Sequence, residues 1–172
     1  MYKFFSQLGR SLLLPIAVLP IAGLLLGIGS AFTADSTIAM MPFLTNWVVA
    51  FILNLMKLAG NAIFSNIALI FAIGISVGFA KEDKGVAGLS GAVAFLIFKA
   101  VSVAMADALF DIKEMDTGVL GALAIGLSVA FLHNKYHMIQ LPQVLGFFSG
   151  SRFVPIVSGF AGLILGCVFA GV

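Results

Sequence analysis

Charged residues and cysteines are both scarce in this 172-residue chain. Only 9% of the residues are charged, against about 25% in soluble globular proteins, and 62% are hydrophobic. So few charges exclude an ordinary soluble domain, and the small net charge of +2 gives no sign of nucleic-acid binding. The single cysteine, Cys167, excludes an internal disulfide and a CxxC metal or redox pair. This is the composition of an integral membrane protein.

Long uncharged runs predict membrane-spanning helices. Arg10 and Asp35 bracket 24 uncharged residues, a helix of about 36 Å that can cross a hydrocarbon core of about 30 Å. A cleaved signal peptide is the alternative, but the run is too long and lacks an A-x-A-like cleavage site. We expect five spans, at about 11–32, 58–80, 85–106, 117–132 and 153–172. The predicted fold is an all-α polytopic membrane bundle, one domain over residues 1–172.

The positions of Lys and Arg predict the orientation, because cations in short loops stay cytoplasmic. With the amino terminus in the cytoplasm, Lys113 is the only cation in an outer loop. The cytoplasmic cations are then Lys3, Arg10, Lys81, Lys84, Lys135 and Arg152. A crossing by residues 36–56 would reverse every later loop and divide the cations evenly. We therefore expect residues 36–56 to remain at the outer surface.

Two segments are predicted to lie in the membrane interface as amphipathic helices. In the first, residues 36–56, a polar or small stripe with helical spacing leads into the second span: Asn46, Ala50, Asn54, Lys57 and Asn61. In the second, on the cytoplasmic side, four apolar residues share one helical face: Leu141, Val144, Leu145 and Phe148.

Polar residues within the spans are the candidate functional residues. Asn61, Ser65 and Asn66 begin the second span, and an unpaired amide facing lipid costs several kcal/mol. They should point into the bundle, either as interhelical hydrogen bonds or as the wall of a polar pathway. Asn61 and Asn66, with Arg152 at the headgroup level of the last span, are the candidate substrate-binding residues. Lys99, inside the third span, either snorkels, pairs with an acid or serves transport.

The histidines and the charged turn carry weaker signals. His133 and His137 have the i, i+4 spacing of a metal pair, but Lys135 lies between them and no carboxylate accompanies them. We expect a solvated loop there and no metal site. The turn 81–84 is likewise expected to be a solvated cytoplasmic turn. No residue pattern indicates catalysis or a bound cofactor.

Small residues predict how the helices pack. Gly74 and Gly78 form a GxxxG in the second span, opposite a stripe that holds Ala72 and Ser76. Such residues let helix backbones approach closely, which is how helices associate in lipid. The same spacing recurs at Gly23–Gly27 and Gly162–Gly166. Ordinary bundle packing and a specific dimer face both remain open.

Four blocks in order resemble the membrane component (enzyme IIC) of the sugar phosphotransferase system, glucose superfamily. They are "LGRSLLLPIAVLPIAGLLLGIGS" (8–30), "NAIFSNIALIFAIGISVGFAKEDKGVAGLSG" (61–91), "DTGVLGAL" (116–123) and "LPQVLGFFSGSRFVPIVSG" (141–159). The resemblance implies a bacterial cytoplasmic membrane protein that transports glucose, maltose, N-acetylglucosamine or a related sugar. Transport would be coupled to phosphorylation by a phosphocysteine-bearing IIB domain, with IIA as a further partner.

The resemblance also implies what this chain lacks. In the family, the amino-terminal five-helix half is the scaffold and dimer interface, and the carboxy-terminal half carries the sugar site. The G-[IVT]-T-E-P motif of that second half is not in this chain, and "LILGCVFAG" around Cys167 does not match the C-[IT]-T-R-L-R of IIB. Two hypotheses follow. The first is a truncated or split scaffold half of a permease, expected to form a homodimer as in the family. The second is a small stand-alone pore or regulator without transport activity.

Overall fold

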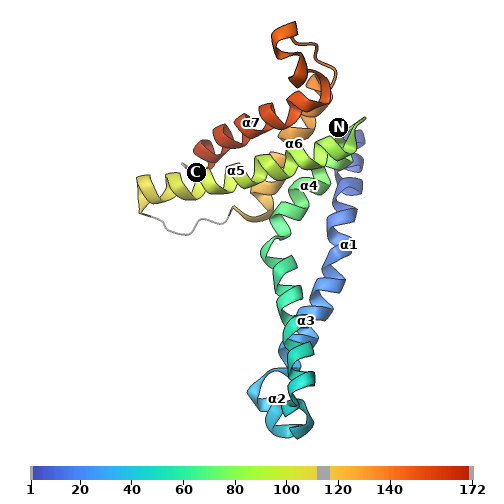
Figure 1. Cartoon of the computed structure of the whole chain (residues 1–172), viewed down its shortest axis with the longest axis vertical. Helices are drawn as coiled ribbons and strands as arrows, with labels where there is room; N and C mark the ends of the chain where they lie inside the picture. The colour runs from blue at the N-terminus through green and yellow to red at the C-terminus, as the bar shows by residue number, and fades with distance from the viewer. Residues whose placement is uncertain (1, 112–116, 171–172) are drawn as a thin grey trace. The chain divides into compact units, whose positions relative to one another are not determined.

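The computed structural model describes residues 2–111 and 117–170 and is helical throughout, with no strand in those ranges. Lys113 lies outside the described residues. The elements are α1 (Tyr2–Phe32), α2 (Asp35–Met40), η1 (Pro42–Thr45), α3 (Trp47–Ser65), α4 (Ile67–Phe79), α5 (Lys84–Phe110), α6 (Gly118–Tyr136), η2 (Gln143–Phe148), η3 (Gly150–Arg152) and α7 (Phe153–Phe169) (Figure 1).

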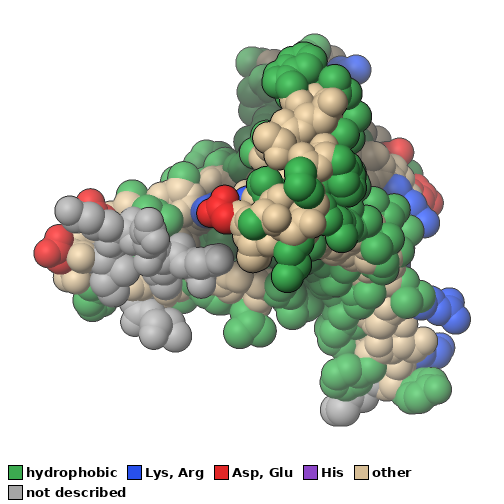
Figure 2. Space-filling model, turned by 90° about the horizontal axis from the view of Figure 1, so that it is seen from below, with side chains coloured by type: hydrophobic (Ala, Val, Ile, Leu, Met, Phe, Trp, Pro, Cys, Tyr) green, Lys and Arg blue, Asp and Glu red, His purple; other side chains and the backbone are tan. Residues whose placement is uncertain are grey.

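Among the described residues, five helical stretches are long and apolar enough to cross a membrane: α1, α3, α5, α6 and Gly150–Phe169. Hydrophobic side chains cover much of the face shown in Figure 2. Lipid is the solvent that such a surface suits, because it leaves no apolar area exposed to water. The predicted all-α polytopic membrane bundle is confirmed.

The chain divides into two compact units. Residues 15–67 form the first, which we call the hairpin unit. Residues 2–14 and 68–170 form the second, which we call the bundle unit. One boundary falls at Pro15 inside α1, and the other falls at Ile67, directly after the break between α3 and α4.

In the bundle unit, α7 packs along α5, and α6 contacts both (Figure 1). Glycines allow these close approaches. A Cβ on Gly162 would collide with the backbone of Ala94, and one on Gly166 would lie 2.8 Å from the Val101 Cβ. The spacing Gly162–Gly166 therefore serves packing within the chain. Phe98 is fully buried between these helices, with its ring 5.4 Å from that of Phe169.

The small residues of α4 are also used inside the bundle unit. The Ser76 hydroxyl donates to the Ala72 carbonyl oxygen at 2.8 Å, and its side chain fills the space that Gly91 leaves. Gly78 packs directly against Ser11 in the first turns of α1. Both predicted small-residue faces of this helix thus contact protein, and the contacts lie within one chain.

The hairpin unit is held by two other glycines. Gly29 of α1 lies against the backbone of Lys57 in α3, and Gly60 of α3 lies against the backbone of Leu26 in α1. Gly23 and Gly27 have no atom within 4 Å of the place where a Cβ would stand. The GxxxG of α1 therefore packs against nothing in this unit.

The expected start of the second span was wrong. Residues 36–56 are not one amphipathic helix, because α3 begins at Trp47 and is itself long enough to span. The Asn46 side chain, the first member of the polar stripe, caps α3 by accepting from the Val48 amide at 3.0 Å, and the helix therefore begins at Trp47. The helix then ends at Ser65, and the 13-residue α4 follows. A single expected span is thus two helices, broken at Asn66.

The second expected interfacial helix is a short 3-10 helix, η2. Its side chains are exposed, Val144 at 94% and Phe147 at 73%. Pro142 precedes η2 and Gly146 lies within it, so an α-helix is disfavoured here. The segment is apolar and exposed, as the sequence predicted, but it forms a 3-10 helix, which is wound more tightly than the expected α-helix.

Candidate functional site

Polar side chains of the bundle unit converge where the α4–α5 turn meets the carboxyl end of α6. We call Glu82, His133, Asn134 and His137 the turn cluster. Asn134 contacts the start of the turn: its Oδ1 accepts from the Lys81 amide at 3.0 Å, and its Nδ2 donates to the Phe79 carbonyl oxygen at 2.9 Å. One side chain of α6 therefore holds the backbone of the turn in place.

The two histidines extend this cluster. His133 Nε2 lies 2.7 Å from the Glu82 carbonyl oxygen, and His137 Nδ1 lies 3.1 Å from the His133 carbonyl oxygen. A carbonyl oxygen only accepts, so each of these ring nitrogens carries the hydrogen. His137 Nε2 then faces a Glu82 carboxylate oxygen at 3.7 Å. That contact is attractive when the His137 ring is protonated on both nitrogens.

The expectation of a solvated loop at His133 and His137 was wrong. α6 continues to Tyr136, so His133 lies inside a helix and is completely buried. The two rings stack with centroids 5.5 Å apart. The turn 81–84 is exposed, as predicted, but it is also anchored to α6. Tertiary contact with the turn, which spacing within α6 does not reveal, accounts for both differences.

In each ring of the histidine pair, one nitrogen is held by a backbone carbonyl oxygen. His133 Nε2 and His137 Nδ1 are occupied by carbonyl oxygens, and His133 Nδ1 is buried without a hydrogen-bond partner. Within residues 2–111 and 117–170, no three His, Cys, Asp or Glu side chains gather as a metal site would require. The hydrogen bonds of Asn134 and His133 fasten α6 to the turn.

The three candidate substrate-binding residues are not brought together as one described site. Asn61 and Asn66 belong to the hairpin unit, and Arg152 belongs to the bundle unit. Asn66 follows the last residue of α3 and donates to the Ala62 carbonyl oxygen at 2.9 Å. Asn61 is exposed on α3 and makes no side-chain hydrogen bond to any described residue.

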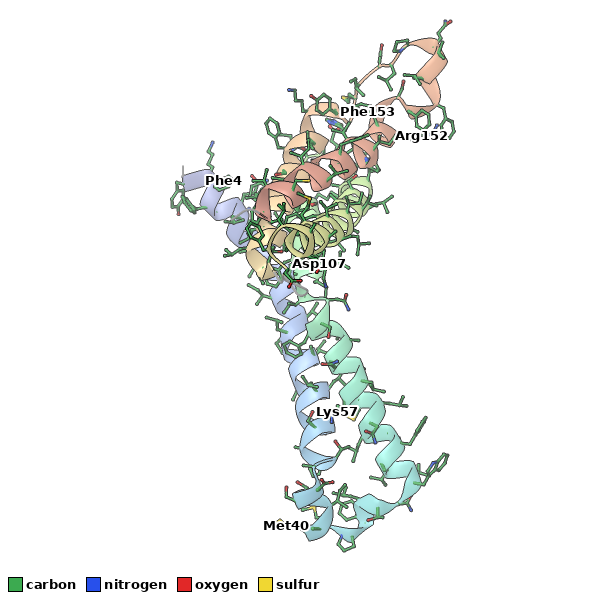
Figure 3. The ribbon with its side chains drawn as sticks, turned by 90° about the vertical axis from the view of Figure 1, so that its left-hand side faces the viewer. Phe4, Met40, Lys57, Asp107, Arg152 and Phe153 are labelled. Carbon is green, nitrogen blue, oxygen red and sulfur yellow. The ribbon has the colours of Figure 1, made fainter. Side chains whose placement is uncertain are left out.

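Arg152 lies at the start of α7 beside Phe153 (Figure 3). Its guanidinium donates to the Phe147 carbonyl oxygen at 3.3 Å and lies 5.1 Å from the centroid of the Phe147 ring. These contacts tie α7 to η2. Arg152 is exposed, so its charge also faces outward.

Lys99 is exposed on α5. Among the described residues, no carboxylate lies within ion-pair distance of it, since the one such pair there is that of His137 with Glu82. Snorkelling is the simplest interpretation for an exposed lysine on a spanning helix: the stem lies along apolar surface and the charged end reaches water.

Two surface clefts of the bundle unit are lined by apolar side chains. One, of about 430 Å³, lies between α5 and α7 and includes Ile97 and Leu163. The other, of about 470 Å³, lies between α6 and α7 and includes Phe131 and Ile164. A sugar needs several hydrogen-bonding groups to replace water, and these walls offer almost none. They suit acyl chains or another helix.

Sequence reasoning missed the turn cluster. Its signal was "HNKYH" at the end of an apolar run, where His and Asn side chains have no lipid-compatible role unless they are bonded. The sequence did not indicate which turn they would meet.

The sequence of this chain is similar to that of known proteins over nearly its whole length. A sequence model of the family "Phosphotransferase system, EIIC" matches residues 9–172. The chain is 40% identical over 180 residues to the "PTS system glucose-specific EIICBA component" of Staphylococcus carnosus (strain TM300), covering 95% of this chain and 26% of that protein. It is 35% identical over 192 residues to the "PTS system maltose-specific EIICB component" of Escherichia coli (strain K12), covering 98% of this chain and 36% of that protein.

The chain thus spans between a quarter and two fifths of the length of these relatives. The match runs through nearly all of both units, and it agrees with the five apolar helices. The chain belongs to the phosphotransferase system EIIC family of membrane proteins.

Proposed function

We propose that this chain is the scaffold part of an EIIC permease that takes up glucose, maltose or a related sugar with coupled phosphorylation. The observation that carries the proposal is the family match along residues 9–172, with glucose- and maltose-specific relatives. The chemistry of the bundle unit supports a scaffold role. Asn134 bonds to the backbone of the α4–α5 turn, and the two clefts beside α7 are apolar.

In this proposal, the sugar is bound chiefly by a further EIIC segment and phosphorylated by a IIB phosphocysteine. The attacked sugar hydroxyl would gain the phosphoryl group, and the cysteine sulfur would lose it. Cys167, exposed on α7, lies within a spanning helix and has no part in that transfer. Asn61, Asn66 and Arg152 remain predicted sugar contacts, of which Asn61 has the least engaged side chain.

The function is tested in cells that lack their own glucose and maltose permeases. Expressed alone, the chain should give neither sugar uptake nor sugar phosphate. Co-expressed with the carboxy-terminal EIIC half and IIB of a close relative, it should restore both, because packed helices can reassemble split membrane bundles. Sugar phosphate formed by the 172-residue chain alone would overturn the scaffold role. Failed rescue with both halves inserted would favour a stand-alone regulator or pore.

We propose an amino terminus in the cytoplasm, supported by the cation distribution. In a Cys167→Ser background, single cysteines at Ser36 and Thr117 should react with an impermeant thiol reagent added outside. Cysteines at Gly85 and Ser149 should not. External labelling at Gly85 would reverse the orientation.

We also propose that the chain forms a homodimer through the hairpin unit. Gly23 and Gly27 support this, since they form a close-packing motif that meets nothing within the unit. In the Cys167→Ser background, Gly23→Cys should cross-link two copies under oxidation. Adding Gly27→Leu should lower the cross-linked fraction, since a leucine side chain holds the backbones apart. An equal cross-linked fraction with and without Gly27→Leu would exclude the Gly23–Gly27 face as the dimer interface.

A further inference from the structure

The amino-terminal turns of α1 form a basic pocket that the transport role does not use. Lys3, Ser6, Gln7 and Arg10 occupy positions i, i+3, i+4 and i+7, so they share one helical face. With Tyr2 and Gly78 of α4 they line a cavity of about 390 Å³. All of these residues belong to the bundle unit. We call this cavity the basic pocket.

The inner wall of the basic pocket is fixed by α4. The Gln7 side-chain amide donates to the Gly78 carbonyl oxygen at 3.4 Å. A Cβ on Gly78 would collide with Ser11, which lies one turn after Gln7 in α1. The Ser11 hydroxyl is in turn bonded to the Gln7 carbonyl oxygen at 2.8 Å. The pocket is therefore a built gap between two helices.

The charges of the basic pocket are uncompensated. Lys3 and Arg10 have no carboxylate within ion-pair distance among the described residues, where the one such pair joins His137 to Glu82. Two cations, a hydroxyl and an amide around one cavity provide the donors that a phosphate group accepts from.

The position along α1 indicates which phosphate would reach the pocket. α1 has 31 residues, about 46 Å of helix, whereas a hydrocarbon core is about 30 Å thick. Its uncharged run begins directly after Arg10, so Lys3 and Arg10 lie at the level of the lipid headgroups. Phe4, near the amino end of the helix in Figure 3, contacts Phe79, and Phe5 is 62% exposed. Aromatic side chains are enriched at this level.

Apolar side chains continue where the cations stop. Leu13 and Leu14, in the turn after Arg10, are 62% and 67% exposed. A ligand whose phosphate binds in the basic pocket would place the groups attached to that phosphate along this apolar surface. A phosphate joined to apolar chains is the structure of a phospholipid. A free phosphate would make no contact with the two leucines.

We propose that the basic pocket binds the headgroup of an anionic phospholipid, with Arg10 and Lys3 on the phosphate and the acyl chains along Leu13 and Leu14. The proposal depends on α1 entering the membrane at Arg10 and is independent of the sugar or of any IIB partner. Phosphatidylglycerol, with one phosphate and no cation of its own, is the probe. Phosphatidylcholine, which carries the same phosphate and a compensating cation, is the matched comparison.

The test is native mass spectrometry of the detergent-solubilised chain titrated with each lipid. Phosphatidylglycerol should bind about tenfold more tightly than phosphatidylcholine. Arg10→Gln and Lys3→Gln should each weaken its binding about tenfold, since each removes one charge-assisted contact. Arg10→Lys should retain part of the affinity. Lys135→Gln removes the same charge from an exposed side chain outside the pocket and should leave binding unchanged.

Equal weakening by Arg10→Gln, Lys3→Gln and Lys135→Gln would overturn the proposal, because it would indicate general charge attraction. Displacement of the lipid by millimolar inorganic phosphate would also overturn it and assign the pocket to free phosphate. Circular dichroism and gel filtration check the fold of each variant. Lys3 and Arg10 are exposed and unpaired, so both variants should fold. Should Arg10→Gln not fold, Lys3→Gln decides alone.

Discussion

The hairpin unit and the bundle unit are about equally apolar but are packed very differently. In the most apolar stretch of α3, 6% of residues are buried, against 39% in α6. The bundle unit has a fully buried phenylalanine, Phe98, and buried serines along α4 and α5. The hairpin unit is joined by the glycine contacts at Gly29 and Gly60.

This difference shows what specifies structure in lipid. Apolar side chains gain nothing by leaving lipid for protein, so hydrophobicity puts both units in the membrane without fixing their partners. Close backbone approach and bonded polar groups do fix partners. The bundle unit uses close glycine contacts and bonded side chains such as Asn134 inside the unit, whereas the hairpin unit leaves Gly23, Gly27 and Asn61 facing outward. We expect the hairpin unit to complete its packing against another protein surface.

The largest effect on stability should come from replacing a closely packed glycine with a larger residue. Gly162→Leu would push a side chain into the Ala94 backbone, and we expect a loss of about 3 kcal/mol or more in the free energy of unfolding. Gly27→Leu, the same change on the open face of the hairpin unit, should alter the stability of the monomer by less than about 0.5 kcal/mol. Thermal unfolding in mild detergent measures both. Similar losses would mean that the two units are packed alike.

A smaller effect should follow from releasing the turn. Asn134→Ala leaves the Lys81 amide and the Phe79 carbonyl oxygen without their partner, at a cost of about 1–3 kcal/mol. Hydrogen exchange should quicken at the Lys81 amide. Lys135→Ala, one residue along the same helix, should leave that exchange rate unchanged. Equal exchange in both variants would show that Asn134 does not hold the turn.

The smallest effect should come from the exposed ion pair. Glu82→Gln removes the carboxylate facing His137 at 3.7 Å but keeps the Glu82 carbonyl oxygen that His133 contacts. Solvent weakens an exposed pair, so stability should fall by less than about 1 kcal/mol. A loss exceeding that of Asn134→Ala in the same unfolding assay would reverse the ranking of these contacts.

Much of the fold follows from local pattern. Charge spacing predicted the apolar helices, and Gly162–Gly166 predicted a close helix contact. The start of α3 was missed because the Asn46 side chain, one member of the polar stripe, caps the helix by accepting from the Val48 amide. The burial of His133 was missed because its partner, Glu82, is 51 residues away in the chain. Contacts across such distances depend on tertiary packing, which a single sequence does not display.

The central claim is that this chain contributes helix packing and leaves most of the sugar binding to a further EIIC segment. It is tested most directly by sugar phosphate formation in the co-expression rescue with two variants. Gly162→Leu should abolish the product, because it separates α7 from α5. Asn61→Ala, on the least engaged of the candidate sugar contacts, should leave at least half of it. Loss of the product in Asn61→Ala with normal membrane insertion, and its retention in Gly162→Leu, would contradict the account.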